Sequence, residues 1–286
     1  MESKFKPYLL LFPVSIVLIS IMGIGIINCI SQSLGYFPQI GLNNFTLDYY
    51  MEVLRDRNFL KSLIFSLKTS FISSSICIVV GVFLAYVLSK DKHSKWRISL
   101  INLPIIITHI IVVIIIFMIF SQTGILSRVL YNLGIINNSS DFIQLVSDKN
   151  GIGIILVYLW KGIPFVAMTT YNILKNISNS LENVAINLGA NKFQVFRYII
   201  LPLAMPSIIS SFLILFAFSF GSYEVPFLIG PSTPKSLSVH AYITYSSSDL
   251  MQRPIAMSIN TILSVISIII LIIYNKIFEK IYINKI

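Results

Sequence analysis

Apolar residues are concentrated in six separate stretches of the chain, each long enough to cross a lipid bilayer. Windows of about 19 residues place these stretches near 8–28, 66–88, 98–120, 152–175, 203–222 and 255–274. The segments between them are too short to hold a soluble catalytic or nucleotide-binding domain. The pattern predicts an all-α polytopic membrane protein with six transmembrane helices, forming a single transmembrane domain over residues 1–286.

Composition supports this class and excludes ordinary soluble proteins. Hydrophobic residues make up 56% of the chain and charged residues only 11%, whereas a soluble domain has about 25% charged residues. The net charge is +10, but the basic residues do not form the clustered face that binds nucleic acid. We therefore expect membrane lipid, and no nucleic acid, among the partners of the chain.

The positions of Lys and Arg predict the orientation in the membrane. If the N-terminus lies inside, more than half of the 21 Lys and Arg residues fall in inside segments, among them Lys90, Lys175 and Arg197. Short loops that carry Lys and Arg stay in the cytoplasm because their translocation is disfavoured. Six spans then place both termini in the cytoplasm, in a multi-pass protein of the bacterial plasma membrane.

The segment 176–202, between the fourth and fifth spans, is the inside segment with the clearest local pattern. Two residue pairs have the spacing of a helix N-cap with a reciprocal side chain: Asn179 with Glu182, and Asn191 with Gln194. Gly189 can adopt the positive φ at which a helix ends. An apolar face follows, made of Val195, Phe196, Ile199 and Ile200. The segment predicts two short helices joined by a tight turn, with Pro202 stopping or kinking the chain at the bilayer.

This spacing resembles the signature loop of the permease subunits of ATP-binding-cassette importers, which reads Glu-Ala-Ala-x3-Gly-x9-Ile-x-Leu-Pro. The matching positions hold Ala185, Gly189, Ile199, Leu201 and Pro202. The chain departs from the family at Asn183, which replaces Glu, and at Val184, which replaces Ala, although Glu182 lies one residue earlier. The alternative is a plain re-entry hairpin that only joins two spans.

The resemblance extends over essentially the whole chain. Residues 41–50, 159–165 and 220–227 are similar to the branch that contains the spermidine/putrescine-type permeases. The resemblance implies a type I importer permease fold and one half of a translocation pathway for a small polar solute, polyamine-like or related. It also implies that the loop residues couple the chain to an ATPase: Glu182, Asn183, Ala185, Gly189, Ile199, Leu201 and Pro202.

The same resemblance implies three protein partners. They are a cytoplasmic ATP-binding-cassette ATPase dimer, a second permease that is a paralogue or another copy, and an extracytoplasmic solute-binding protein. The chain has no Gly-x4-Gly-Lys-Ser/Thr stretch with which to hold phosphates. We therefore expect ATP to be bound by the partner, and this chain to be a non-catalytic subunit without a cofactor.

Three ionisable residues at or near bilayer depth are candidates for the translocation pathway: His109, Lys161 and Glu224. Such groups cost about 2.5–3.5 kcal/mol on insertion scales and mark a pathway or a partner on another helix. A structural role stays open for each: packing for His109, a bond to a backbone carbonyl for Lys161, and an anchor for Glu224. Because His109 has no companion ligand at a suitable spacing, we expect no metal site.

Two other function classes and the nature of the cargo stay open at this point. An ion-coupled secondary transporter needs intramembrane carboxylates or broken helices, and no predicted span contains Asp or Glu. A membrane-embedded enzyme would need a catalytic motif such as His-Glu-x2-His, which the chain lacks. The resemblance favours a polyamine, whereas Lys161 without a companion carboxylate would repel a cation and suit an anion or a zwitterion.

Overall fold

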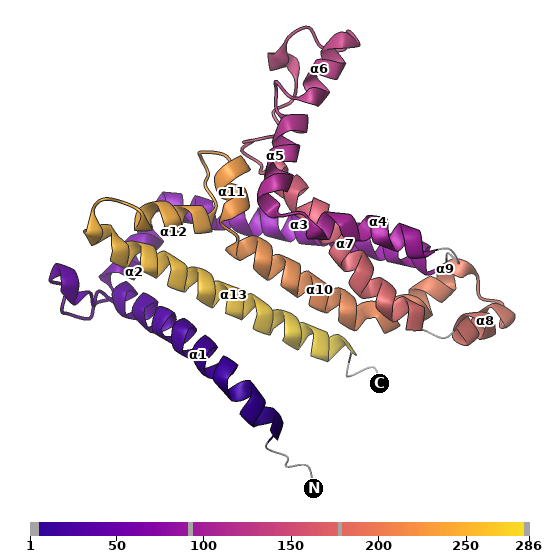
Figure 1. The fold of residues 1–286 in the computed structure, drawn as a ribbon, viewed down its shortest axis with the longest axis horizontal. Coiled ribbons are helices and arrows are strands. Elements are labelled where there is room, and N and C mark those ends of the chain that lie inside the picture. Colours follow the sequence, from indigo (N-terminus) through magenta and orange to yellow (C-terminus); the bar gives the residue numbers. More distant parts are fainter. Residues whose placement is uncertain (1–5, 91–93, 177–178, 283–286) are drawn as a thin grey trace. The chain divides into compact units, whose positions relative to one another are not determined.

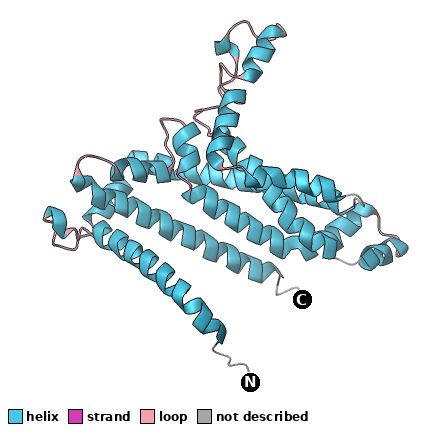
Figure 2. Ribbon diagram, viewed as in Figure 1, coloured by secondary structure: helices cyan, strands magenta, loops and turns pink. Residues whose placement is uncertain are grey.

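The computed structural model describes residues 6–90, 94–176 and 179–282. Within these residues helices are joined by loops, and no β-strand forms (Figure 2). The long helices, labelled in Figure 1, are α1 (Lys6–Ser33), α3 (Arg57–Ser89), α4 (Ser94–Ile106), α5 (His109–Phe120), α7 (Ile152–Asn176), α10 (Leu201–Gly221) and α13 (Arg253–Tyr282). The shorter ones are α2 (Asp48–Arg55), α6 (Ile125–Asn132), α8 (Asn179–Asn187), α9 (Lys192–Val195), α11 (Glu224–Ile229) and α12 (Leu237–Tyr245).

Single helical turns complete the secondary structure. Three are 3₁₀ turns, at Pro38–Ile40, Ser139–Asp141 and Leu250–Gln252, and one is a π-helical turn at Phe196–Ile200.

Six helical stretches among the described residues are long and apolar enough to cross a bilayer. They are Leu11–Ser33, Arg57–Ser89, His109–Asn132, Ile152–Lys175, Lys192–Gly221 and Leu250–Tyr274. The predicted all-α membrane class is therefore confirmed. The chain ends, whose side of the membrane was predicted, include residues 1–5 and 283–286, which lie outside the described residues. Residues 177–178 of the predicted loop also lie outside them.

The predicted third span, 98–120, is wrong as one continuous helix. α4 ends at Ile106, residues 107–108 are not helical, and α5 begins at His109. Pro104 weakens the last turn of α4 because it lacks a backbone N–H and its ring crowds the preceding turn. Thr108 then takes an extended conformation, with φ −66° and ψ 152°, from which α5 starts. The break places His109 in the first turn of a new helix.

Internal contacts divide the chain into two compact units. The first unit consists of Met1–Leu60 and His240–Ile269. A hydrogen bond joins its two segments: the Ser258 hydroxyl donates to the carbonyl of Ser33 at 3.1 Å. Within the first segment, the hydroxyls of Ser33 and Tyr50 lie 2.6 Å apart. The prediction that residues 1–286 form a single domain stays a prediction.

The second unit consists of Lys61–Val239 and Ile270–Ile286 and holds two buried apolar clusters. The first apolar cluster joins α3, α7, α9 and α10 through Cys77, Val82, Ala85, Leu88, Val166, Tyr171, Leu174, Val195, Ile200, Ala204 and Ile208. The second joins α3, α5, α7 and α11 through Phe65, Val112, Val113, Ile116, Val146, Ile154, Val157, Tyr158, Val225 and Ile229. Beyond this core, α6 extends away from α7 and α10 (Figure 1).

Small residues allow α3 and α7 to approach closely in the second unit. Gly81 and Cys77 on α3 face Val166 and Gly162 on α7, so the two helices run in the same direction. A Cβ atom on Gly81 would lie only 2.6 Å from the Cβ of Val166 and 3.0 Å from the carbonyl oxygen of Ile163. Packing of membrane helices depends on such close contacts.

We expect Gly81→Ala to weaken the α3–α7 contact, because the added methyl group must push α7 away. Overpacking of this kind costs about 1–3 kcal/mol, so the melting temperature of the detergent-solubilised protein should fall. Gly23→Ala in α1 is the matched control, since a Cβ there would meet no atom within 4 Å. Equal melting temperatures for the two variants would contradict the close packing at Gly81.

Candidate functional site

The α8–α9 hairpin (residues 179–195) turns at Gly189. The φ of this residue is +90°, a left-handed conformation that residues with a Cβ atom rarely adopt. The N–H of Ala190 donates to the carbonyl of Ala185 at 3.0 Å, and the N–H of Gly189 donates to that of Ile186 at 2.9 Å. These two bonds form the Schellman pattern of a helix C-terminus. The predicted turn at Gly189 is confirmed.

A capping box starts α9. The Asn191 side chain accepts from the N–H of Gln194 at 2.9 Å, and the Gln194 side chain accepts from the N–H of Asn191 at 2.8 Å. This reciprocal pair satisfies backbone donors at the helix start and confirms the second predicted cap. The first predicted cap is displaced, because Asn179 is the first helical residue of α8 and not the residue before it.

One face of the hairpin region is packed onto the rest of the second unit. Val195 and Ile200 are only 1% and 6% exposed, and Leu88 of α3 belongs to the same apolar cluster. Tyr86 of α3 meets Phe196 edge to face, with ring centroids 4.9 Å apart. These contacts confirm the predicted apolar face and attach the hairpin to the end of α3.

The helix does not end at Pro202. The π-helical turn Phe196–Ile200 runs directly into α10, and the N–H of Leu201 donates to the carbonyl of Phe196. Pro202 has no N–H to donate and its ring crowds the preceding turn. The wider π turn, with i→i+5 hydrogen bonds, relieves this crowding without breaking the helix. Of the two outcomes predicted at Pro202, the stop is therefore wrong, and α9 is continuous with α10.

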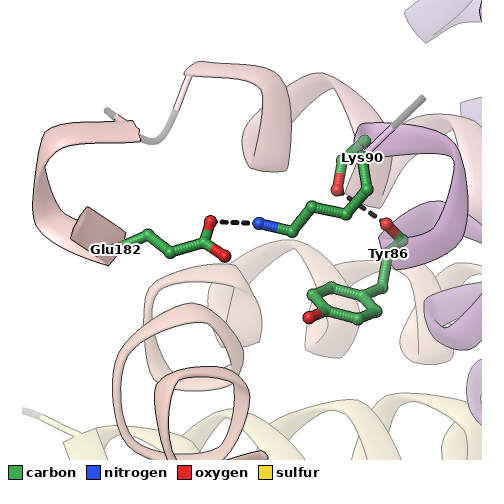
Figure 3. Close-up of polar contacts among 4 residues, drawn as sticks. Tyr86, Lys90 and Glu182 are labelled. Carbon is green, nitrogen blue, oxygen red and sulfur yellow. Dashed lines mark hydrogen bonds and ion pairs between the residues drawn. The ribbon is translucent and has the colours of Figure 1, made fainter. Parts of the chain in front are cut away.

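An ion pair joins α8 to the end of α3 (Figure 3). The ammonium of Lys90, directly after α3, pairs with the carboxylate of Glu182 in the first turn of α8. The same ammonium lies 5.6 Å from the centroid of the Tyr86 ring, a cation–π arrangement. Sequence reasoning missed Lys90 as a site residue, because it is 92 positions from Glu182 and only the fold brings the two together.

The other face of the hairpin is exposed and apolar. Leu181, Val184 and Leu188 have the i, i+3, i+7 spacing of one helical face. Leu188 is 83% exposed and Phe193 is 72% exposed. Asn183, which replaces the glutamate of the family motif, is also exposed. An exposed apolar patch on a rigid element is typical of a protein-docking surface.

The three predicted pathway residues come together in the second unit. His109 begins α5, Lys161 lies within α7 and Glu224 begins α11. The imidazole of His109 lies within electrostatic range of both the Lys161 ammonium and the Glu224 carboxylate. Glu224 is exposed, and the other two residues are half-buried. These three residues form the polar cluster. The expectation that Lys161 has no companion carboxylate stays a prediction.

Aromatic rings line one side of the polar cluster. His109 stacks on Phe218 of α10 with ring centroids 5.1 Å apart. Phe218 also meets Tyr158 of α7 edge to face at 6.4 Å, and the Tyr158 hydroxyl donates to the carbonyl of Ser219 at 3.3 Å. The surroundings therefore combine charged side chains with aromatic rings.

Comparison with known families decides the class of the chain. Residues 77–282 match the family model described as "Binding-protein-dependent transport system inner membrane component". The chain belongs to this family. As a permease of this family it is a transport subunit and not an enzyme, and the match favours neither an ion-coupled secondary transporter nor a membrane-embedded enzyme.

Curated relatives of this permease include two spermidine/putrescine transport system permease proteins named PotB. The protein of Haemophilus influenzae is 33% identical over 168 residues, which cover 58% of this chain and 57% of that protein. The protein of Escherichia coli is 28% identical over 232 residues, which cover 80% of this chain and 82% of that protein.

Solved structures share the fold of this permease. A chain of a bacterial ABC transporter that imports the acidic polysaccharide alginate superposes with a TM-score of 0.79 at 18% identity, covering 96% of this chain and 95% of that one. A second structure of a bacterial alginate transporter, in complex with an alginate-bound periplasmic protein, gives a TM-score of 0.77 at 19% identity, covering 96% and 94%. The predicted importer permease fold is confirmed.

Proposed function

We propose that this permease forms half of the translocation pathway of an ATP-binding-cassette importer for a small polar solute, driven by a separate ATPase dimer. The α8–α9 hairpin carries the proposal. One of its faces is fixed to α3, and the other presents exposed apolar side chains to a partner. This outer face is the docking surface for the ATPase, which binds the ATP.

The coupling residues divide between the turn and the helix that follows it. Ala185 and Gly189 hold the turn through backbone hydrogen bonds. Ile199, Leu201 and Pro202 lie on the helical stretch that continues from the hairpin into α10. Because this stretch is unbroken, displacement of the hairpin by the ATPase moves the fifth span with it.

The other proposed partners complete the importer. A second permease, paralogous or identical, supplies the other half of the pathway, and an extracytoplasmic binding protein delivers the solute. The periplasmic protein in the alginate transporter structure supports a partner of this kind. With the hairpin and both termini in the cytoplasm, as the distribution of Lys and Arg predicts, the ATPase and the binding protein act on opposite sides of the membrane.

The proposed cargo is a polyamine or a related amine. The two PotB relatives support this class, and the polar cluster offers Glu224 as a contact for an ammonium group. Lys161 in the same cluster would limit how strongly a cation is held, since like charges repel. A pathway must bind its solute weakly enough to release it. Attraction by Glu224 and repulsion by Lys161 would together keep the binding of an ammonium group weak.

The proposed function is tested by purifying the tagged permease in detergent from cells that co-express its candidate ATPase and second permease. We expect both to co-purify, and the reconstituted complex to take up spermidine only when ATP is hydrolysed. Solute uptake into vesicles by this chain with no ATPase present would contradict the proposal.

We expect Gly189→Val to reduce ATP-driven uptake while leaving membrane insertion unchanged. A residue with a Cβ atom in the left-handed conformation costs about 1–2 kcal/mol, a factor of about 5–30 in the population of the native turn. Gly134→Val is the matched control, since Gly134 also has a positive φ, +71°, and open space around it, but lies outside the hairpin. Normal uptake by the Gly189 variant would count against a coupling role for the hairpin.

We expect Lys161→Met to change uptake more than it changes abundance, because it removes a charge from the pathway and not from the helix packing. A change of about tenfold would correspond to about 1.4 kcal/mol of interaction with the solute. Lys68→Met serves as the comparison, because Lys68 is exposed and donates to the Asn150 side chain at 3.3 Å. Parallel losses of uptake and abundance for Lys161→Met would instead support a structural bond.

A further inference from the structure

The end of α3 holds the hairpin region at two points. Tyr86 and Lys90 are four residues apart, so their side chains lie on the same side of the helix end. The Tyr86 ring contacts Phe196 on the π turn, and the Lys90 ammonium pairs with Glu182 on α8. The ammonium also lies over the Tyr86 ring, at 5.6 Å from its centroid. Tyr86 therefore takes part in the aromatic contact and also lies beside the ion pair, and Figure 3 shows its ring next to the Lys90 side chain.

The chain provides no short covalent path between these parts. Lys90 and Glu182 are 92 positions apart in the sequence. α9 continues into α10, whereas α3 can follow the hairpin only through side-chain contacts. The buried contacts among Val195, Ile200 and Leu88 attach α9 and the π turn to α3, and Ala185 of α8 packs against the same cluster. The ion pair adds a contact at the first turn of α8.

Both charges also suit the helix ends on which they lie. A cation beside the C-terminus of α3 and a carboxylate in the first turn of α8 each interact favourably with the dipole of their own helix. Lys90 and Glu182 are 38% and 21% exposed, and an ion pair open to water contributes little to folding stability. The buried apolar cluster stabilises the fold, so the role left to the ion pair is to orient α8 relative to α3.

We propose that Lys90 and Glu182 are positioning residues that tether α8 to α3, so that a displacement of the hairpin by the ATPase reaches α3 as well as α10. This inference rests on the proposed function. Glu182 thus faces its own chain, and the outer face of the hairpin, including Asn183, is left to the partner.

The test follows the distance between α3 and the hairpin through the ATPase cycle. Spin labels are placed at Val87→Cys and Asn187→Cys, two exposed positions, in a background with Cys29 and Cys77 replaced by serine. The complete complex with its ATPase is measured before and after ATP addition. We expect a narrow distance distribution that ATP leaves unchanged in the parent protein. In variants that also carry Lys90→Gln or Glu182→Gln, the distance distribution should broaden and shift when ATP is added.

A double-mutant cycle separates the tether from independent effects. We expect spermidine uptake per ATP hydrolysed to fall by about two- to fivefold in either single variant, the range of an exposed ion pair. In the double variant Lys90→Gln/Glu182→Gln, the ratio should fall no further than in the single variants. Lys90→Arg, which keeps the charge, should restore the ratio. Lys175→Gln, at an exposed lysine in the last turn of α7, should leave it unchanged.

The outcomes distinguish the tether from the proposed function. Distance distributions that respond to ATP identically with and without the ion pair would overturn the tether, as would multiplied losses in the double variant. Loss of ATPase binding in the single variants would also overturn it, because it would make these residues part of the docking surface. If the parent protein binds no ATPase, the proposed function itself fails.

Discussion

Backbone hydrogen bonding in hydrocarbon is the constraint on which this structure depends. An unpaired N–H or C=O costs several kcal/mol in the bilayer, so irregular backbone is tolerated only where protein surrounds it or where it lines a water-filled cavity. Two departures from α-helix carry the candidate site. The break at residues 107–108 places His109 at the start of α5, and the π turn at Phe196–Ile200 joins the hairpin to α10. In both places irregular backbone positions residues that a regular helix would direct elsewhere.

The two apolar clusters of the second unit organise these sites separately. The first cluster includes Val195 and Ile200, and so holds the hairpin region. The second includes Val112 of α5 and Val225 of α11, and so holds the helices from which His109 and Glu224 project. α3 and α7 contribute to both clusters and pack closely at Gly81. One rigid pair of parallel helices therefore connects the region offered to an ATPase with the region proposed to meet the solute.

Local features of the fold could be predicted from the sequence, whereas long-range ones could not. The turn at Gly189 and the cap at Asn191 depend on residues within five positions of each other, so their patterns can be recognised in the sequence. The π turn escaped prediction because proline is compatible with a stop, a kink or a widened helix, and packing decides among them. The pairing of Lys90 with Glu182, and the gathering of the polar cluster, depend on how helices distant in sequence pack, which periodicity does not encode.

The π turn also gives the spacing of the loop motif a geometric meaning. Each residue added to or removed from a helix rotates everything beyond it by about 100° and shifts it by about 1.5 Å. The π turn accommodates about one residue more than an α-helical turn does, so the hairpin keeps its phase relative to α10. Deleting one residue from Lys192–Val195 would instead swing Gly189 and α8 around the axis of α10 and carry Glu182 away from Lys90. The number of residues between Gly189 and Ile199 thus fixes the orientation of the hairpin relative to α10. This segment tolerates exchanges of side chains far better than changes of length.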